Sequence, residues 1–180
     1  MPENPDFPHA TADALVRRAV PEFESILTGY ACNLTGDLEM ARDVVQDTFI
    51  KLYAQDPAKL DGPGLKAWLF TVCRNRALDL MRRRRRLVSM EETPVDHLTD
   101  PAPAPDDYAA DQDETELVLR TFKRLPANQA EVLRLKFRHD LSYQEIAEVT
   151  GLSPSNVGFL IHTGLKRLRI LLAPEATAFS

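Results

Sequence analysis

Side chains that could bind phosphate groups are concentrated in two places along the chain. Arg82 to Arg86 form a run of five arginines, and residues 120–180 hold nine lysines and arginines against five acids. A guanidinium group pairs with phosphate oxygens through charge and paired hydrogen bonds, so these residues favour nucleic acid as the ligand. The sequence shows no Ser/His/Asp or Cys/His arrangement, no metal-ligand cluster and no glycine-rich phosphate loop. We therefore expect a binding protein that is not an enzyme and holds no cofactor or metal.

The formal net charge of −5 hides this pattern, because the charges are unevenly distributed. Residues 1–86 hold 13 bases and 12 acids, whereas residues 87–119 hold ten acids and no base. The three blocks thus carry balances of +1, −10 and +4. Two near-neutral or basic blocks that flank one acidic segment are compatible with a bipartite nucleic-acid binder.

The C-terminal basic block contains the most specific pattern in the chain. Ser142 and Glu145 have the spacing of a capping box, Gly151 suits a left-handed turn, and Ser153 followed by Pro154 begins a second helix. Ala147 is small where the two helices must approach closely, and the residues that would fill the core between them are Ile146, Leu152, Val157 and Leu160. This spacing predicts a helix-turn-helix, with an ordinary pair of antiparallel helices as the alternative.

The second helix of such a unit enters the major groove of DNA, and its N-terminal residues meet the bases. The candidate DNA-binding residues of this helix are Ser155, Asn156, Phe159, His162, Thr163, Lys166 and Arg167. His162 has no partner ligands at a useful spacing, so a metal is not expected there.

The elements before the arginine run read as a bundle of about three helices. Apolar spacing predicts a helix over residues 12–35, with a break or kink at Pro21, and a second helix that Asp37 caps and that ends near Tyr53. A loop rich in Asp, Pro and Gly follows over residues 55–64. The next helix spans residues 65–86 and ends in the arginine run.

Two polar surfaces of this bundle are candidates for binding. One face of the second helix carries Asp43, Gln46 and Asp47. A stripe along the last helix consists of Trp68, Thr71, Asn75 and Arg82. Each surface has a plainer alternative: a solvated face for the acids, a core position for the tryptophan, and for the arginines a favourable interaction with the negative end of the helix.

The fold class is therefore all-α, with two small helical domains joined by an acidic, proline-rich linker. The boundaries are 12–86 for the N-terminal bundle, 87–112 for the linker and 113–172 for the helix-turn-helix domain. In the second domain, we place Pro126 in the first turn of a helix that buries Val132, Leu133, Phe137, and Leu135 or the stem of Lys136. Cys32 and Cys73 lack CxxC spacing and read as reduced core thiols. Neither a membrane span nor a secretory signal is recognisable, so a cytoplasmic protein is expected.

Three stretches taken together resemble the sigma factors of bacterial RNA polymerase, in the extracytoplasmic-function (ECF) group of the sigma-70 family. They are LTGDLEMARDVVQDTFIKLY, LKAWLFTVCRNRALDLMRRRRR and LPANQAEVLRLKFRHDLSYQEIAEVTGLSPSNVGFLIHTGLKRLR. The resemblance covers roughly residues 20–86 and 113–170, the family's regions 2 and 4. It implies a subunit that binds core RNA polymerase and directs transcription from specific promoters, with region 4 on the −35 element and region 2 on the melted −10 element.

The resemblance also implies roles for the candidate residues. Asp43, Gln46 and Asp47 would dock on the β′ clamp helices, with the β flap as a further polymerase contact, and the loop over residues 55–64 would hold a flipped −10 base. The −10 element would contact Trp68, Thr71, Asn75, Arg82, Arg83 and Arg84. The acidic linker would thread through polymerase, or serve only as a flexible spacer, and an anti-sigma factor is an expected partner.

Gly158 departs from the family, in which Lys/Arg-Ser-Arg often follows the valine of the recognition helix, so specificity for individual bases does not transfer. Two further classes of function stay open from the sequence. One is a regulator that binds duplex DNA without polymerase, and the other is an all-α enzyme, for which the sequence offers no candidate cluster.

Overall fold

The structure is a computed structural model that describes residues 7–60, 64–90 and 119–176. Every regular element in these ranges is a helix, so the predicted all-α fold class is confirmed. The chain divides into two compact units, unit 1 within Met1–Pro105 and unit 2 within Asp106–Ser180. Of the predicted acidic linker, residues 91–112 lie outside the described residues.

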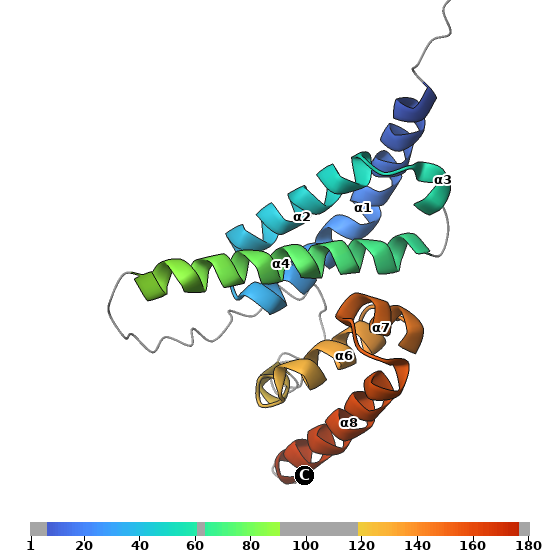
Figure 1. Cartoon of the computed structure of the whole chain (residues 1–180). Helices are drawn as coiled ribbons and strands as arrows, with labels where there is room; N and C mark the ends of the chain where they lie inside the picture. The colour runs from blue at the N-terminus through green and yellow to red at the C-terminus, as the bar shows by residue number, and fades with distance from the viewer. Residues whose placement is uncertain (1–6, 61–63, 91–118, 177–180) are drawn as a thin grey trace, which may run out of the picture. The chain divides into compact units, whose positions relative to one another are not determined.

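Unit 1 is a helical bundle made of α1 (Phe7–Thr35), α2 (Leu38–Tyr53), α3 (Pro57–Leu60) and α4 (Gly64–Met90) (Figure 1). The helix α1 packs against both α2 and α4, and α2 also packs against α4. Fully buried side chains from all three long helices meet between them, and the largest are Leu27, Tyr30, Val44, Leu52, Leu69 and Phe70. The rings of Tyr30 and Phe70 meet edge to face with centroids 5.0 Å apart, a favourable aromatic geometry.

The turn between α1 and α2 follows the sequence prediction. Gly36 ends α1 at a φ of 69°, and its N–H donates to the Cys32 carbonyl (2.9 Å). Asp37 then caps α2, because its Oδ1 accepts the Met40 N–H at 3.1 Å. This start sets the rotation of α2, which buries Ala41, Val44, Val45, Thr48 and Leu52.

Several predicted boundaries in unit 1 were wrong. The helix α1 begins at Phe7 instead of residue 12 and is continuous through Pro21, so of the predicted break or kink the break does not occur. Ala19 and Phe23 are buried on either side of the exposed Pro21, so packing on one face holds the helix together across the missing hydrogen bond. Residues 57–60 of the predicted loop form the short helix α3.

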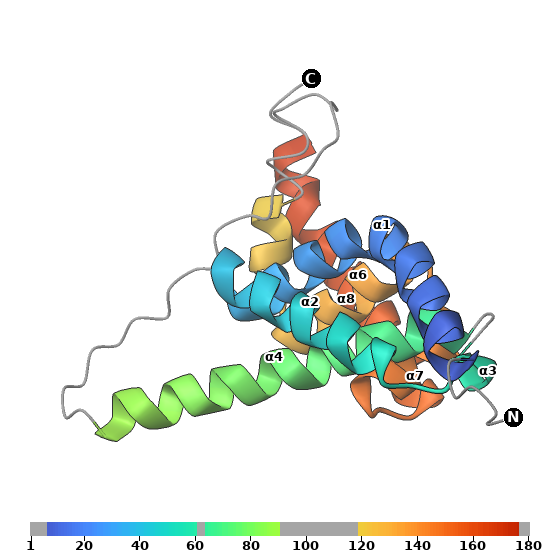
Figure 2. The same cartoon turned by 90° about the horizontal axis from the view of Figure 1, so that it is seen from above.

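The helix α4 also continues past its predicted end at Arg86 and reaches Met90, inside the predicted linker. Arginine and leucine are good helix formers, and no proline occurs before Pro94 to stop the helix. Its C-terminal half extends beyond α1 and α2 (Figure 2).

Unit 2 contains a short helix over residues 119–123, followed by α6 (Ala127–Phe137), α7 (Tyr143–Thr150) and α8 (Pro154–Ala176). Ser142 and Glu145 form the predicted capping box at the start of α7, and Gly151 ends that helix with a φ of 73°. Ser153 caps α8 by accepting the Asn156 N–H at 3.2 Å. The predicted helix, turn and second helix between residues 142 and 169 are therefore confirmed.

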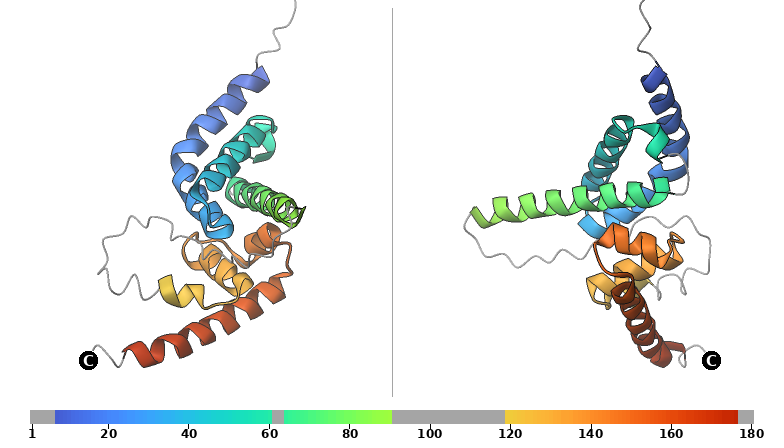
Figure 3. Two further views of the ribbon diagram at one scale, coloured as in Figure 1. Left: turned by 90° about the vertical axis from the view of Figure 1, so that its left-hand side faces the viewer. Right: turned by 45° about the vertical axis from the view of Figure 1, so that its right-hand side comes forward.

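The core of unit 2 lies where α8 meets α6 and α7 (Figure 3). Ile146, Val157 and Leu160 are buried as predicted, whereas Leu152 is only half-buried. At Gly164, α8 approaches α6 so closely that an added Cβ would lie 2.9 Å from Leu133 Cδ1. A glycine is therefore required for this contact to form without displacing Leu133.

Two predictions for α6 need correction. Pro126 is the residue just before the helix, with a ψ of 140°, and does not lie in its first turn. Val132, Leu133 and Leu135 are buried, but Phe137 is 63 % exposed. The chain turns back after Phe137, and the fully buried Leu141 occupies the core at that end instead.

Candidate nucleic-acid interfaces

The polar stripe on α4 lies opposite the buried face of that helix. Steps of about 100° per residue place Trp68, Thr71, Asn75 and Arg82 within roughly 60° of one another, and Cys73 and Ala77 on the far side. Cys73 and Ala77 are both fully buried, whereas Asn75 is exposed and Trp68 is half-buried. Thr71 is also half-buried, and its hydroxyl donates to the Ala67 carbonyl at 2.7 Å. Among the uncharged side chains of the stripe, Asn75 is therefore the one most open to solvent.

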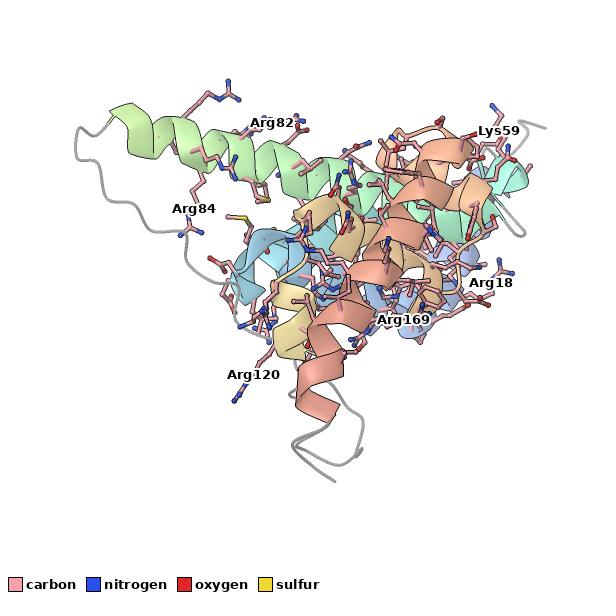
Figure 4. All side chains as sticks on the ribbon, turned by 90° about the horizontal axis from the view of Figure 1, so that it is seen from below. Arg18, Lys59, Arg82, Arg84, Arg120 and Arg169 are labelled. Carbon is pink, nitrogen blue, oxygen red and sulfur yellow. The ribbon has the colours of Figure 1, made fainter. Side chains whose placement is uncertain are left out.

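The arginines that follow do not share one environment. Arg82 pairs with Asp79 on the same helix (2.9 Å), whereas Arg84 reaches Asp37, the residue that caps α2 (3.4 Å). Arg82 and Arg84 leave α4 on opposite sides (Figure 4). Arg86 returns to the side of Arg82, where its Nε donates to the Arg82 carbonyl at 3.4 Å.

The acidic face of α2 is divided in a similar way. Asp43 and Gln46 are exposed, as a docking surface requires. Asp47 instead accepts a hydrogen bond from Arg76 Nε of α4 at 2.6 Å, and the two side chains are 35 % and 27 % exposed. The exposed part of this face continues into Ile50 and Tyr53.

Sequence reasoning missed Ile50 and Tyr53, which are 59 % and 46 % exposed. They follow Asp43 by seven and ten positions and so fall on the same side of α2. That spacing would have identified them. The face of α2 thus has a polar N-terminal half and an apolar C-terminal half.

The outer face of α8 carries nearly all of its predicted residues in exposed positions. Those that are exposed are Ser155, Asn156, Phe159, His162, Lys166 and Arg167. Thr163 is different: it is half-buried, its hydroxyl donates to the Phe159 carbonyl (2.8 Å), and it accepts a hydrogen bond from Gln129 Nε2 of α6 (3.4 Å). This geometry directs Thr163 toward α6.

The space beside Gly158 is occupied by the ring of Tyr143, which sequence reasoning also missed. A Cβ at Gly158 would lie 3.5 Å from Tyr143 Cε2. The Lys136 ammonium group lies 5.8 Å from the centre of the same ring, within range of a cation–π contact. Tyr143 is 44 % exposed and so contributes to the surface next to the start of α8.

The described residues contain no group of three or more His, Cys, Asp and Glu side chains that could hold a metal ion. Cys32 and Cys73 are free and buried, as predicted. Burial raises the pKa of the Cys73 thiol to about 12, although a hydrogen bond with Thr48 acts in the opposite direction. The pKa of Cys32 is raised by burial and, secondarily, by the charge of Asp37. No helix in the described ranges is both long and apolar enough to cross a membrane.

A helix-turn-helix unit and a second helical unit with a basic, outward-facing helix together define a bipartite DNA-binding protein. Comparison with known families identifies both parts. Residues 15–87 match the model of sigma-70 region 2, and residues 115–168 match that of sigma-70 region 4.

Proteins of known function that are similar to this chain point to one group within the family. The ECF RNA polymerase sigma factor SigL of Mycobacterium tuberculosis is 30 % identical over 165 residues, which cover 91 % of this chain and 92 % of SigL. The ECF sigma factor RpoE of Cereibacter sphaeroides is 32 % identical over 133 residues, or 73 % of this chain and 69 % of RpoE. The chain belongs to the sigma-70 family, in its ECF group. It is a sigma factor that directs promoter-specific initiation of transcription by RNA polymerase.

A solved structure supports the same assignment. The sigma factor RpoE from Bartonella quintana, in complex with the anti-sigma factor NepR, is similar with a TM-score of 0.69 and 26 % sequence identity. The similarity covers 87 % of this chain and 96 % of that chain.

Proposed function

We propose that the two units divide the work of a sigma factor between distinct, named surfaces. In unit 1, Asp43 and Gln46, extended by Ile50 and Tyr53, dock on the β′ clamp helices of core polymerase. The stripe on α4 holds the separated strands of the −10 element. In unit 2, the outer face of α8 reads the −35 duplex, and the β flap supplies a further polymerase contact. The observation that carries this proposal is that the α4 stripe faces away from the core of its own bundle.

The chemistry of each surface fits its proposed ligand. Bases that leave the stack need aromatic or polar surfaces next to basic groups, and Trp68, Asn75 and Arg82 supply these along one side of α4. Duplex DNA accepts a helix in its major groove, and the start of α8 presents Ser155, Asn156 and Phe159 outward. The mixed polar and apolar face of α2 is suited to protein.

The same proposal covers the protein's wider setting. The chain acts in the cytoplasm, has no catalytic activity of its own and requires no cofactor. An anti-sigma factor holds it inactive by covering its polymerase-binding surfaces. The support for such a partner is the relative from Bartonella quintana, which was solved with one.

Two experiments test this proposal in order. Transcription start sites mapped after overexpression would supply promoters with a shared −10 and −35 element. Run-off transcription on these promoters, with purified core polymerase and this chain, should then give specific transcripts that core polymerase alone does not give. If no transcript appears while the chain alone shifts duplex DNA, a regulator independent of polymerase is the correct function.

A further inference from the structure

Two ion pairs join α2 to α4 across the bundle of unit 1. Asp47 meets Arg76 at 2.6 Å, and Asp37 meets Arg84 at 3.4 Å. The later acid on α2 pairs with the earlier arginine on α4, so the two helices run antiparallel. The acids are ten positions apart and the arginines eight, which corresponds to roughly 15 Å and 12 Å of helix. The pairs therefore hold α4 at two well-separated points.

The arginines that make these pairs lie away from the DNA stripe. At about 100° per residue, Arg84 is roughly 160° around α4 from Arg82, whereas Arg86 is only about 40° from it. Figure 4 shows the opposite directions of Arg82 and Arg84 directly. Arg76 is likewise about 120° from Arg82, toward α2. A run of five arginines thus surrounds the helix and cannot place every member on one strand of DNA.

From this geometry we infer that Arg76 and Arg84 are positioning residues, which fix the rotation of α4 through Asp47 and Asp37. Arg82 and Arg86 are then the arginines in line with Trp68 and Asn75 that meet promoter phosphates. This inference rests on the proposed function of the α4 stripe. It changes two roles implied by the family resemblance, because Asp47 acts within the bundle and Arg84 is directed away from the −10 element.

The two ion pairs differ in strength, although both restrain the rotation of α4. The Asp47–Arg76 pair is partly shielded, with both side chains about one-third exposed or less, and its distance is that of a strong charge-assisted hydrogen bond. The Asp37–Arg84 pair is more open, with Arg84 59 % exposed, and solvent screens it. The first pair is therefore the stronger restraint on the rotation of α4, and the second restrains its C-terminal half.

The first test compares Arg84→Ala with Arg86→Ala, two matched changes on opposite sides of the helix. The affinity of holoenzyme for a forked promoter fragment with a single-stranded −10 region is measured across a range of salt concentrations. Loss of one phosphate contact lowers the slope of log affinity against log salt by about one. We expect this loss for Arg86→Ala and an unchanged slope for Arg84→Ala.

The second test is a charge exchange between Asp47 and Arg76. We expect Asp47→Arg alone to reduce open-complex formation at least several-fold, and the double variant Asp47→Arg with Arg76→Asp to recover most of it. If Asp47 instead contacts polymerase directly, the double variant keeps an arginine at that contact and stays as defective as Asp47→Arg. Thermal melts of each variant confirm that unit 1 remains folded.

The outcomes separate this inference from the proposed function. If Arg84→Ala lowers the salt slope as much as Arg86→Ala does, or if the charge exchange restores nothing, the inference is wrong while the proposed DNA surface stands. If neither arginine variant changes the slope, Arg86 does not contact phosphate and the inference fails; if Arg82→Ala also leaves it unchanged, the basic end of α4 does not contact DNA and that part of the proposed function fails too.

Discussion

The two helices that we propose carry DNA-facing surfaces, α4 and α8, are held in place by different kinds of contact. Both are long, at 27 and 23 residues, and each buries one side and exposes a polar, basic side. Apolar packing anchors α4, but the ion pairs of Arg76 and Arg84 also link it to α2. By contrast, α8 is seated by close apolar contact, in which Gly164 lies against Leu133.

This difference bears on how each surface responds to its surroundings. Partly exposed ion pairs weaken as salt screens them, so the restraint that Asp47 and Asp37 place on α4 is weaker at high salt, although its apolar packing is not. Interdigitated apolar contacts hardly respond to salt and do not deform gradually. The surface that we propose for separated strands is thus held partly by contacts that salt weakens, whereas the surface proposed for duplex DNA is held by close apolar packing.

The largest effect that can test this comparison comes from Leu133→Ala. Leu133 is fully buried against α8, so its truncation should cost about 2–5 kcal/mol through lost burial and the cavity left behind. Hydrogen–deuterium exchange of the full chain should show faster exchange in α6, α7 and α8 and no change in α1 and α4. The matched control is Leu27→Ala, in the core of unit 1, which should give the reverse pattern. Faster exchange in both units for either variant would show that their cores are not independent.

The next largest effect is functional and concerns α4, where the change is Asn75→Ala. Removing the exposed amide of the α4 stripe should cost about 1–3 kcal/mol in open-complex formation, or roughly 5- to 150-fold, because a partner in the melted promoter loses its hydrogen bond. Affinity for core polymerase should stay the same. Thr28→Val on α1 is the control, since it removes a hydroxyl outside the stripe that already donates to the Glu24 carbonyl. Loss of core binding in Asn75→Ala would show that the stripe belongs to the polymerase interface.

These two helices also show which features the sequence could predict. Signals that lie within a few residues of one another were reliable: the cap at Asp37, the capping box at Ser142 and the left-handed turn at Gly151 all formed as expected. Each depends on local backbone chemistry that no distant contact overrides. The helical period likewise identified the α4 stripe opposite the core.

Features that depend on distant partners could not be predicted in the same way. The continuity of α1 through Pro21 depends on packing of its neighbours, and the exposure of Phe137 depends on where Leu141 returns to the core. The partners of Arg76 and Arg84 are acids 29 and 47 positions away. Sequence spacing shows that these side chains are charged but does not show which charges they meet, so the division of the arginine run emerged only from the structure.

A smaller pair of effects compares two glycines on α8 itself. Gly158→Ala should stabilise unit 2 by about 1 kcal/mol, because alanine is the better helix former and its Cβ would make only ordinary contact with Tyr143. Gly164→Ala should have the opposite sign, since crowding against Leu133 costs about 1–3 kcal/mol and outweighs the gain in helix propensity. Urea unfolding, monitored through hydrogen–deuterium exchange in α8, measures the change in stability for each variant. Equal stabilisation by the two variants would mean that Leu133 moves aside easily and that α8 is not tightly seated.

The last effect concerns Cys73 on the buried side of α4, and its dependence on pH appears only in alkaline solution. Burial raises the pKa of the folded thiol from 9.0 to about 12. Between these values the unfolded chain releases a proton that the folded chain retains, so this thiol's contribution is complete below about pH 9 and is lost as the pH rises toward 12. The difference in unfolding free energy between the wild type and Cys73→Ala should therefore be constant up to about pH 9 and shrink above it. A difference that stays constant to about pH 10.5 would mean that water reaches the thiol. In that case the buried side of α4 would be packed less tightly than α8 is against Leu133, and the difference between the two helices would extend beyond the ion pairs.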